Sequence, residues 1–247
     1  MQLTPQISLV GSGAMGFDLT DPLDCHIYLL DGGSAAALID AGCGNSVEPI
    51  LANAAAAGVP AEKIRYLLLT HAHGDHAGGA AQLKARLPWL EVIASPLAAQ
   101  WVRTGDEQAV SLNMGKKAGF YPQEYRFEPC PVGLEVREGE TVRVGEVELK
   151  ALETPGHCDG HLCFLGPVGD RRVLFGGDLV FFGGQVSLQN IWDCRIPEYA
   201  QSMAKLRGAG VDVLLPGHLS VSLRHGQRHI DAANALFERV YVPKAIF

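Results

Sequence analysis

Residues 67–79 read LLLTHAHGDHAGG and place three histidines and one aspartate within six consecutive positions, directly after a run of leucines. The apolar run that begins at residue 63 (KIRYLLLT) predicts a strand that is covered on both faces. Imidazole and carboxylate groups at the end of such a strand are costly to bury unless they have partners. Because divalent metal ions take these groups as ligands, the stretch predicts a metal site at the end of a buried strand.

The spacing within this stretch suggests two groups of ligands. His71 and His73 alternate at the strand end and suit one ion, whereas Asp75 and His76 point elsewhere and suit a second. Four side chains cannot complete two coordination spheres, so other strand ends must contribute. Three further segments combine a strand, a tight turn and a metal-binding side chain: LETPGHCDGH with His157, VLFGGDLV with Asp178 and VDVLLPGHLS with His218.

The composition of the chain is that of a globular enzyme. Of its 247 residues, 47% are hydrophobic and 19% are charged, far from the composition of disordered chains. The formal net charge is -7 and no run of Lys or Arg occurs, which argues against nucleic acid or an anionic membrane as the main partner. We therefore expect a small-molecule substrate, with no nucleic-acid and no membrane partner.

The ends of the chain and its cysteines bear on compartment and assembly. The first residues, MQLTPQISLV, lack the basic and apolar regions of a signal peptide. The six cysteines include no C-x-x-C pair, so we interpret them as free thiols of a cytoplasmic protein. The apolar end VYVPKAIF (240–247) suits docking on its own domain or on a partner chain in a homodimer.

Strand and helix signals alternate along the chain and predict a layered α/β sandwich formed by one domain over 1–247. Residues 97–131 break the alternation and are expected to form a cap or insert. The expected hairpins turn at 31–33 and at 169–170. Helices are expected over 46–59, 77–88, 196–210 and 226–240, and strands over 63–70, 91–95, 134–154 and 211–217.

The motif THAHGDHAGG (70–79) fits H-x-H-x-D-H, and the chain therefore resembles the metallo-β-lactamase superfamily. The family's later motifs follow in order as TPGH (154–157), GGD (176–178) and PGH (216–218), and LIDAG (38–42) resembles its aspartate-containing turn. The resemblance implies an αββα sandwich, in which two facing mixed sheets have helices outside and the metal ions lie at one edge.

The same resemblance implies a role for each candidate ligand. It places one ion on His71, His73 and His157 and a second on Asp75, His76 and His218, with Asp178 bridging both. Asp40 and His161 are expected to lie behind the ligands and orient them. The implied cofactors are two zinc ions, for which iron or manganese can substitute.

The implied reaction is hydrolysis of a small ester, thioester or lactone. In such sites a hydroxide bridging the two ions attacks the carbonyl carbon, and Asp75 is the expected catalytic residue that steers it or passes a proton to the leaving group. TPGHCDGHLCF (154–164) resembles the TPGH-x-x-GH motif of glyoxalase II and its relatives. The basic residues that those enzymes carry after the bridging aspartate are missing, and Phe181 stands where acyl-homoserine lactonases have tyrosine, so the chain matches neither subfamily.

Two alternatives remain open at this point. A persulfide dioxygenase-like oxidoreductase would use a single iron held by His71, His157 and Asp178. A binding module that kept the metal without catalysis is the other. For a hydrolase, the expected pocket residues are Met15 and Phe17 in the glycine-rich loop 11–21, and Phe181, Phe182, Asn190 and Arg195 after the bridging aspartate. The aromatic residues of 110–127 are further candidates, among them Tyr121 and Tyr125.

Overall fold

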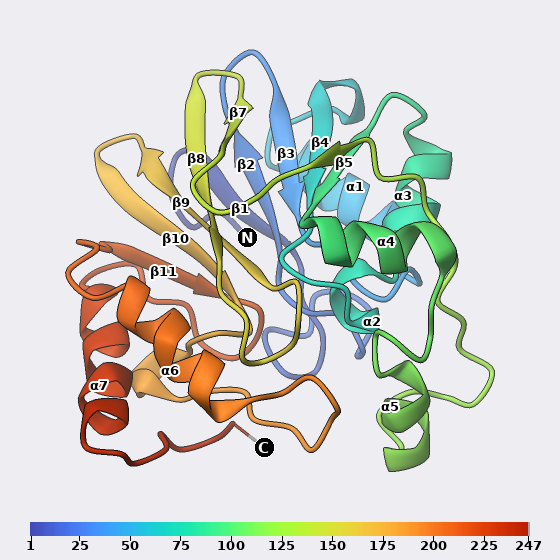
Figure 1. The fold of residues 1–247 in the computed structure, drawn as a ribbon. Helices are drawn as coiled ribbons and strands as arrows, with labels where there is room; N and C mark the ends of the chain where they lie inside the picture. The colour runs from blue at the N-terminus through green and yellow to red at the C-terminus, as the bar shows by residue number, and fades with distance from the viewer. Residues whose placement is uncertain (247) are drawn as a thin grey trace.

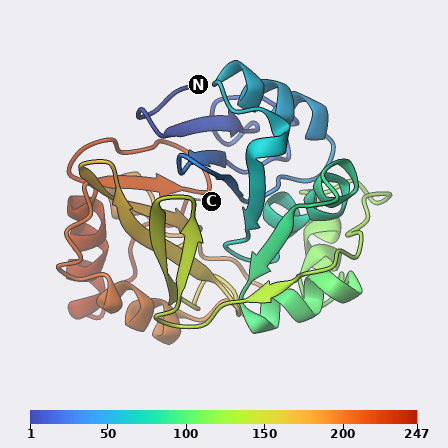
Figure 2. The same cartoon turned by 90° about the horizontal axis from the view of Figure 1, so that it is seen from above.

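The computed structural model describes residues 1–246 and shows two mixed β-sheets facing each other with helices on both outer sides (Figure 1, Figure 2). The first sheet has the order β1 (Ile7–Gly11), β2 (Ile27–Asp31), β3 (Ala36–Ile39), β4 (Ile64–Leu68), β5 (Glu91–Ala94), β6 (Leu134–Glu135). The second has the order β11 (Val213–Pro216), β10 (Arg171–Gly177), β9 (Leu162–Val168), β8 (Val147–Glu153), β7 (Thr141–Val144).

Both sheets mix parallel and antiparallel pairs. In the first, β1, β2 and β3 are antiparallel neighbours and β3 to β6 are parallel. In the second, β10 and β11 are parallel and the other pairs are antiparallel. The helices are α1 (Val47–Ala56), α2 (Gly74–Ala77), α3 (Ala80–Arg86), α4 (Pro96–Thr104), α5 (Leu112–Ala118), α6 (Ile196–Lys205) and α7 (Gln227–Glu238), with short 3-10 turns η1 (Ala61–Lys63) and η2 (Phe182–Gly184).

Three apolar layers hold the four structural layers together. Neighbouring side chains in a strand point to opposite faces, so Tyr28 and Leu30 pack between the sheets while Ile27 and Leu29 pack toward the helices. A third cluster joins the second sheet to α6 and α7. The predicted strand over 63–70 forms as β4, and its leucines 67–69 are buried, but Arg65 near its start is exposed and Tyr66 is only partly buried. The αββα sandwich expected from the sequence is therefore confirmed.

Both expected hairpins form, one between β2 and β3 and one between β9 and β10. The expected helix over 77–88 forms as the shorter α3, and the separate short helix α2 ends at Ala77, where the expected helix begins. Residues 97–131 contain two helices. In this segment α4 packs into the outer helix layer through Trp101 and Val102, and α5, which lies farther from the sheets (Figure 1), joins the same apolar cluster through Leu112. Among residues 1–246, no helix has the length and apolarity to cross a membrane.

Candidate metal centre

Three histidine rings converge beside the end of β4. His73 Nδ1 lies 3.1 Å from His71 Nε2 and 3.0 Å from His157 Nε2. The other nitrogen of each of these two partners is already used, because His71 Nδ1 lies 3.0 Å from the Thr70 hydroxyl and His157 Nδ1 lies 3.1 Å from the carbonyl of Ser187. With those nitrogens donating, the two Nε2 lone pairs both face His73.

A second group of metal-binding side chains converges next to the first and consists of Asp75, His76 and His218. Asp75 Oδ2 lies 3.1 Å from His218 Nε2 and 3.5 Å from His76 Nε2, and the two imidazole nitrogens lie 3.3 Å apart. His76 donates from Nδ1 to Asp40 Oδ2 across 2.9 Å, so its Nε2 lone pair faces the group. His76 and Asp40 are both buried.

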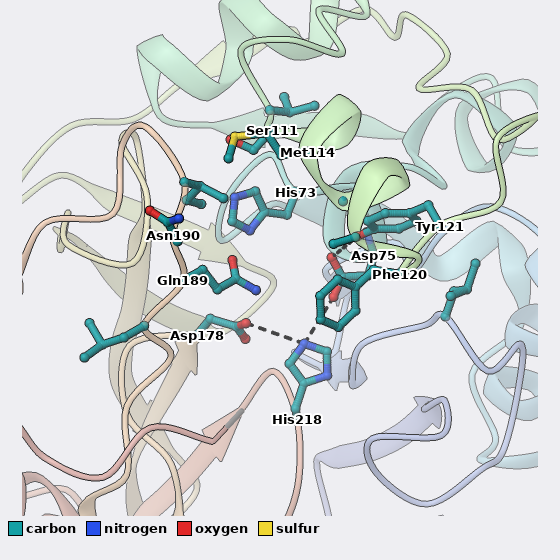
Figure 3. Close-up of a pocket in the computed structure, with 16 residues that line it drawn as sticks. His73, Asp75, Ser111, Met114, Phe120, Tyr121, Asp178, Gln189, Asn190 and His218 are labelled. Carbon is teal, nitrogen blue, oxygen red and sulfur yellow. Dashed lines mark hydrogen bonds and ion pairs between the residues drawn. The ribbon is translucent and has the colours of Figure 1, made fainter.

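Asp178 lies between the two groups (Figure 3). Its Oδ2 is 3.7 Å from His157 Nε2 and 3.5 Å from His218 Nε2, and its Oδ1 is 3.4 Å from His76 Nε2. This Oδ1 is buried without a hydrogen-bond partner, which is costly for a carboxylate unless a cation lies beside it. A single carboxylate is thus shared by both groups of donors.

The donor atoms fit metal ions. Ligands held at about 2.0–2.2 Å in a tetrahedron lie roughly 3.4 Å from one another, close to the spacings in both groups. Facing imidazole lone pairs repel one another unless a proton or a cation lies between them. The site therefore has donor sets with the spacing to hold metal ions, in one group of His71, His73 and His157 and another of Asp75, His76 and His218.

The electrostatics of the first donor group agree with this interpretation. Burial, together with the neighbouring imidazole of His157, lowers the pKa of His73 to about 3, and burial also lowers the pKa of His71 and of His157. Neutral imidazoles are the form that binds a metal. In the second group, Cys25 and the carboxylates around His76 outweigh burial and hold the pKa of His76 well above the ordinary value. Burial alone would raise the pKa of Asp178, but the neighbouring imidazoles of His218 and His76 outweigh it and the pKa lies well below its ordinary value.

Two buried side chains orient the donors from behind. Asp40 accepts from the backbone N–H of Thr70 (2.7 Å) and from its hydroxyl (2.8 Å), in addition to His76. His161 accepts from the backbone N–H of Asp178 through Nε2 (3.1 Å), and its Nδ1 lies 2.9 Å from the Thr154 hydroxyl. Both residues lie where the sequence placed them, behind the donors rather than among them.

A cavity of about 490 Å³ opens beside the two groups. His73, Asp75, Asp178 and His218 border it, and most of its remaining wall is apolar. Figure 3 shows Gln189 and Asn190 across the cavity from Tyr121. The apolar lining residues are Leu23, Val110, Met114, Ala118, Phe120, Leu188 and Ile191.

Of the six pocket residues expected from the sequence, Asn190 lines this cavity. Phe181 does not line it: its side chain is fully buried, and its ring stacks on that of His218 with 6.5 Å between the ring centroids. Phe182 lies next in the chain but turns its ring toward His229, with 4.4 Å between the ring centroids. Arg195 is engaged by ion pairs with Asp159 and Glu198.

Met15 and Phe17 also lie outside the lining. The Met15 carbonyl accepts from Leu219 N–H at 2.7 Å, and the half-exposed Phe17 ring lies 5.4 Å from His26. His26, interpreted from the sequence as a packing residue, lies 2.7 Å from the Leu219 carbonyl through Nε2 and 3.0 Å from the Ser12 hydroxyl through Nδ1. Met15 and His26 therefore hold Leu219, next to His218, whereas Leu23 is the residue of the segment 11–26 that lines the cavity.

Two segments form much of the cavity wall, and both contain predicted pocket residues: Asn190 in 188–191, and Phe120 and Tyr121 among the aromatic residues of 110–127. The segment 188–191 forms one wall without any periodic pattern that would mark it. Tyr121 forms part of the other wall and contacts Asp75 directly: its hydroxyl donates to Asp75 Oδ1 at 2.7 Å. The sequence predicted Tyr121 as a pocket candidate but not its contact with Asp75. Gly74 and Gly115 leave the room that the Tyr121 ring occupies.

The fold and the site together define an αββα protein with a paired histidine and aspartate site at one edge of its sheets. Residues 20–218 match the family model of the Metallo-beta-lactamase superfamily. The chain belongs to this superfamily.

Relatives in the superfamily are mostly hydrolases. The chain is 29% identical to an atrochrysone carboxyl ACP thioesterase of Aspergillus fumigatus, over 79% of this chain and 51% of that protein. It is also 29% identical to a hydroxyacylglutathione hydrolase of Rhodopseudomonas palustris, over 62% of this chain and 47% of that protein. The chain thus spans about half the length of these relatives.

A solved structure extends the similarity over nearly the whole fold. A metallo-β-lactamase of Cronobacter sakazakii with a HARLDQ motif superposes with a TM-score of 0.73, at 25% identity, over 97% of this chain and 96% of that one.

Proposed function

We propose that this chain is a dinuclear metal-dependent hydrolase that cleaves a small ester, thioester or lactone, with a thioester as the preferred substrate. The observation that carries the proposal is the shared position of Asp178 between two groups of three donors at the mouth of a largely apolar cavity. Zinc is the proposed metal, since nitrogen and carboxylate donors at tetrahedral spacing suit it.

Two divalent ions, when bound, polarise a carbonyl group and make water nucleophilic at neutral pH. The chain's own residues provide the geometry for that chemistry. Asp40 and His161 fix the donors, and Asp178 belongs to both groups. Asp75 borders the cavity and is the proposed acid–base residue, because it is the carboxylate placed to accept a proton from water and return it to the leaving group.

The lining of the cavity favours a substrate whose acyl group is uncharged. Its walls are largely apolar, and none of the described residues that line it is Lys or Arg. Burying a hydrocarbon chain there contributes about 0.8 kcal/mol per methylene group. Two relatives are named for acyl groups carried on a thiol, an acyl carrier protein in one case and glutathione in the other, which favours a thioester over an oxygen ester.

The partners and the location that we propose follow from the same features. The substrate is a small molecule, and neither nucleic acid nor a membrane is a partner. The net charge of -7 supports this proposal. We also propose a cytoplasmic location and retain a homodimer through the C-terminal end as a hypothesis, supported by the exposure of Val240, Tyr241 and Val242.

The first experiment is elemental analysis of protein purified without chelator or added metal. About two zinc ions per chain, followed by chelator-sensitive cleavage of an acyl thioester faster than of the matched oxygen ester, would support the proposal. About one iron per chain, with oxygen consumption on a persulfide, would replace it with the dioxygenase alternative. If the chain binds metal but turns over neither acyl esters and thioesters nor persulfides, the result would favour the non-catalytic binding module.

A further inference from the structure

Tyr121 makes two hydrogen bonds to one residue of the metal centre. Its hydroxyl donates to Asp75 Oδ1 at 2.7 Å and accepts from the backbone N–H of Asp75 at 3.1 Å. The other carboxylate oxygen of Asp75, Oδ2, faces His218 and His76. The two oxygens thus have separate partners, one from the cavity wall and one from the donor group.

The contact is built into the surrounding structure. The rings of Tyr121 and Tyr125 stack with 5.3 Å between their centroids. The Tyr125 hydroxyl donates to the carbonyls of Cys43 (2.8 Å) and Gly74 (3.1 Å), and so holds the same turn by its backbone. A Cβ atom at Gly115 would lie 2.8 Å from the Tyr121 ring, so this position in α5 has room only for glycine unless the ring moves.

Without such a partner, an aspartate carboxylate turns easily, because its terminal torsion is broad and nearly two-fold. A turned carboxylate would no longer present Oδ2 to His76 and His218. The Tyr121 hydroxyl opposes that rotation, since it accepts from the backbone and donates to the side chain of the same residue. The ring that carries it is part of the cavity wall next to α5 (Figure 3).

We propose that Tyr121 is a positioning residue that aims Asp75 Oδ2 at the donor group of His76 and His218 and joins that group to the substrate wall. The effect on catalysis rests on the proposed function. The effect on metal binding does not, and the test therefore reads the metal directly.

The test is Tyr121→Phe in the full chain, with cobalt(II) as the probe ion. The ring remains, so the cavity wall is kept and only the hydroxyl is lost. We expect the dissociation constant of one of two cobalt ions to rise about tenfold while the other stays unchanged, with a change in the visible absorption of the weakened ion. With a thioester substrate, kcat should fall about tenfold while KM stays within about twofold, since the residue orients the metal group.

Two matched variants distinguish a specific effect on the position of Asp75 from a general loosening of the turn that carries it. Tyr125→Phe removes the hydroxyl of the stacked neighbour, which bonds only backbone carbonyls, and should leave the cobalt spectrum as in the unmodified chain. Gly115→Ala keeps the Tyr121 hydroxyl but displaces its ring, and should weaken the same cobalt ion as Tyr121→Phe does.

Unchanged cobalt affinities and spectrum in Tyr121→Phe would overturn the proposal. An equal spectral change in Tyr125→Phe would also overturn it, because the turn would then respond to any lost hydroxyl. If the unmodified chain binds two cobalt ions but cleaves no thioester, the proposed function fails, and the cobalt measurements still decide the role of Tyr121.

Discussion

His76 donates a hydrogen bond from Nδ1 to Asp40 Oδ2 across 2.9 Å, and both side chains are buried. The same carboxylate binds the backbone N–H and the hydroxyl of Thr70, and that hydroxyl lies 3.0 Å from His71 Nδ1. One aspartate at the end of β3 therefore reaches both groups of the metal centre, His76 directly and His71 through one threonine. Groups behind a metal ligand fix its ring orientation and raise its basicity.

Asp40→Asn should weaken metal binding without removing any donor atom. The amide keeps the size of the carboxylate but carries no charge and turns an N–H₂ group toward one of its three donors, so we expect about 10–100-fold weaker binding. Competition for zinc against a chromophoric chelator measures this. Asp31→Asn, at a partly exposed ion pair with Lys63, is the control. Equal zinc affinity of the two variants would contradict an orienting role for Asp40.

Asp75→Asn should keep much of the metal but lose most hydrolysis. The amide oxygen can still face His218, whereas the amide cannot take up a proton at neutral pH, and loss of a general acid–base group typically costs about 10²–10⁴-fold in rate. Metal content and kcat for a thioester, measured on the same sample, separate the two effects. If Asp75→Asn keeps full activity at full metal content, Asp75 is not the acid–base residue.

His218→Ala should abolish the second metal group. Its Nε2 lies 3.1 Å from Asp75 Oδ2 and 3.5 Å from Asp178 Oδ2, so its loss leaves the second group with one imidazole and two carboxylates, of which Asp178 is shared with the first group. We expect the metal content to fall from about two ions per chain to about one, together with loss of turnover. If turnover survives the substitution, the two-metal mechanism is wrong.

Phe181→Ala should lower stability. The ring is fully buried and stacks on the ring of His218, with 6.5 Å between the ring centroids, and truncation of such a ring costs about 3–5 kcal/mol of unfolding free energy. Urea unfolding with zinc in excess measures the loss. Phe182→Ala, at a 41% exposed ring, is the neighbouring control and should cost much less. If Phe181→Ala changes the substrate preference without lowering the stability, Phe181 is a pocket residue after all.

Asp193 predicts a pH dependence of stability. Burial raises its pKa from 3.8 to about 6, and its Oδ2 accepts from the N–H of Asp159 at 2.9 Å. The folded state therefore binds more protons than the unfolded state between about pH 4 and 6, so this residue's contribution to stability falls as the pH rises through that window. The loss amounts to about 2–3 kcal/mol.

The comparison of unfolding free energies at pH 4.5 and pH 7 for the unmodified chain and Asp193→Asn isolates this contribution, since every other titrating group is common to both. We expect the asparagine variant to lose less stability over the interval. Identical differences for the two proteins would show that Asp193 titrates alike in the folded and unfolded states.

Much of the fold could be predicted from local patterns. The apolar run at 64–68 marks the strand β4, and the glycine-containing turns at 31–33 and 169–170 mark the hairpins, because turn geometry and side-chain alternation are properties of neighbouring residues. The packing of 97–131 could not be predicted in this way. Trp101 and Val102 belong to the outer layer only because the first sheet offers an apolar face there.

By itself, the sequence determined the αββα layers and the seven side chains that meet at one edge, since strand ends followed by tight turns carry a local signature and the family motif orders them. Only the tertiary structure decided which side chains share a space with the substrate. In the folded chain Phe181 is buried, Arg195 forms ion pairs, and Tyr121 contacts Asp75, which lies 46 positions earlier in the sequence. The physical reason is that cavity walls are loops from separate layers. The distances between these loops depend on how the layers pack, and that packing cannot be predicted from patterns among neighbouring residues.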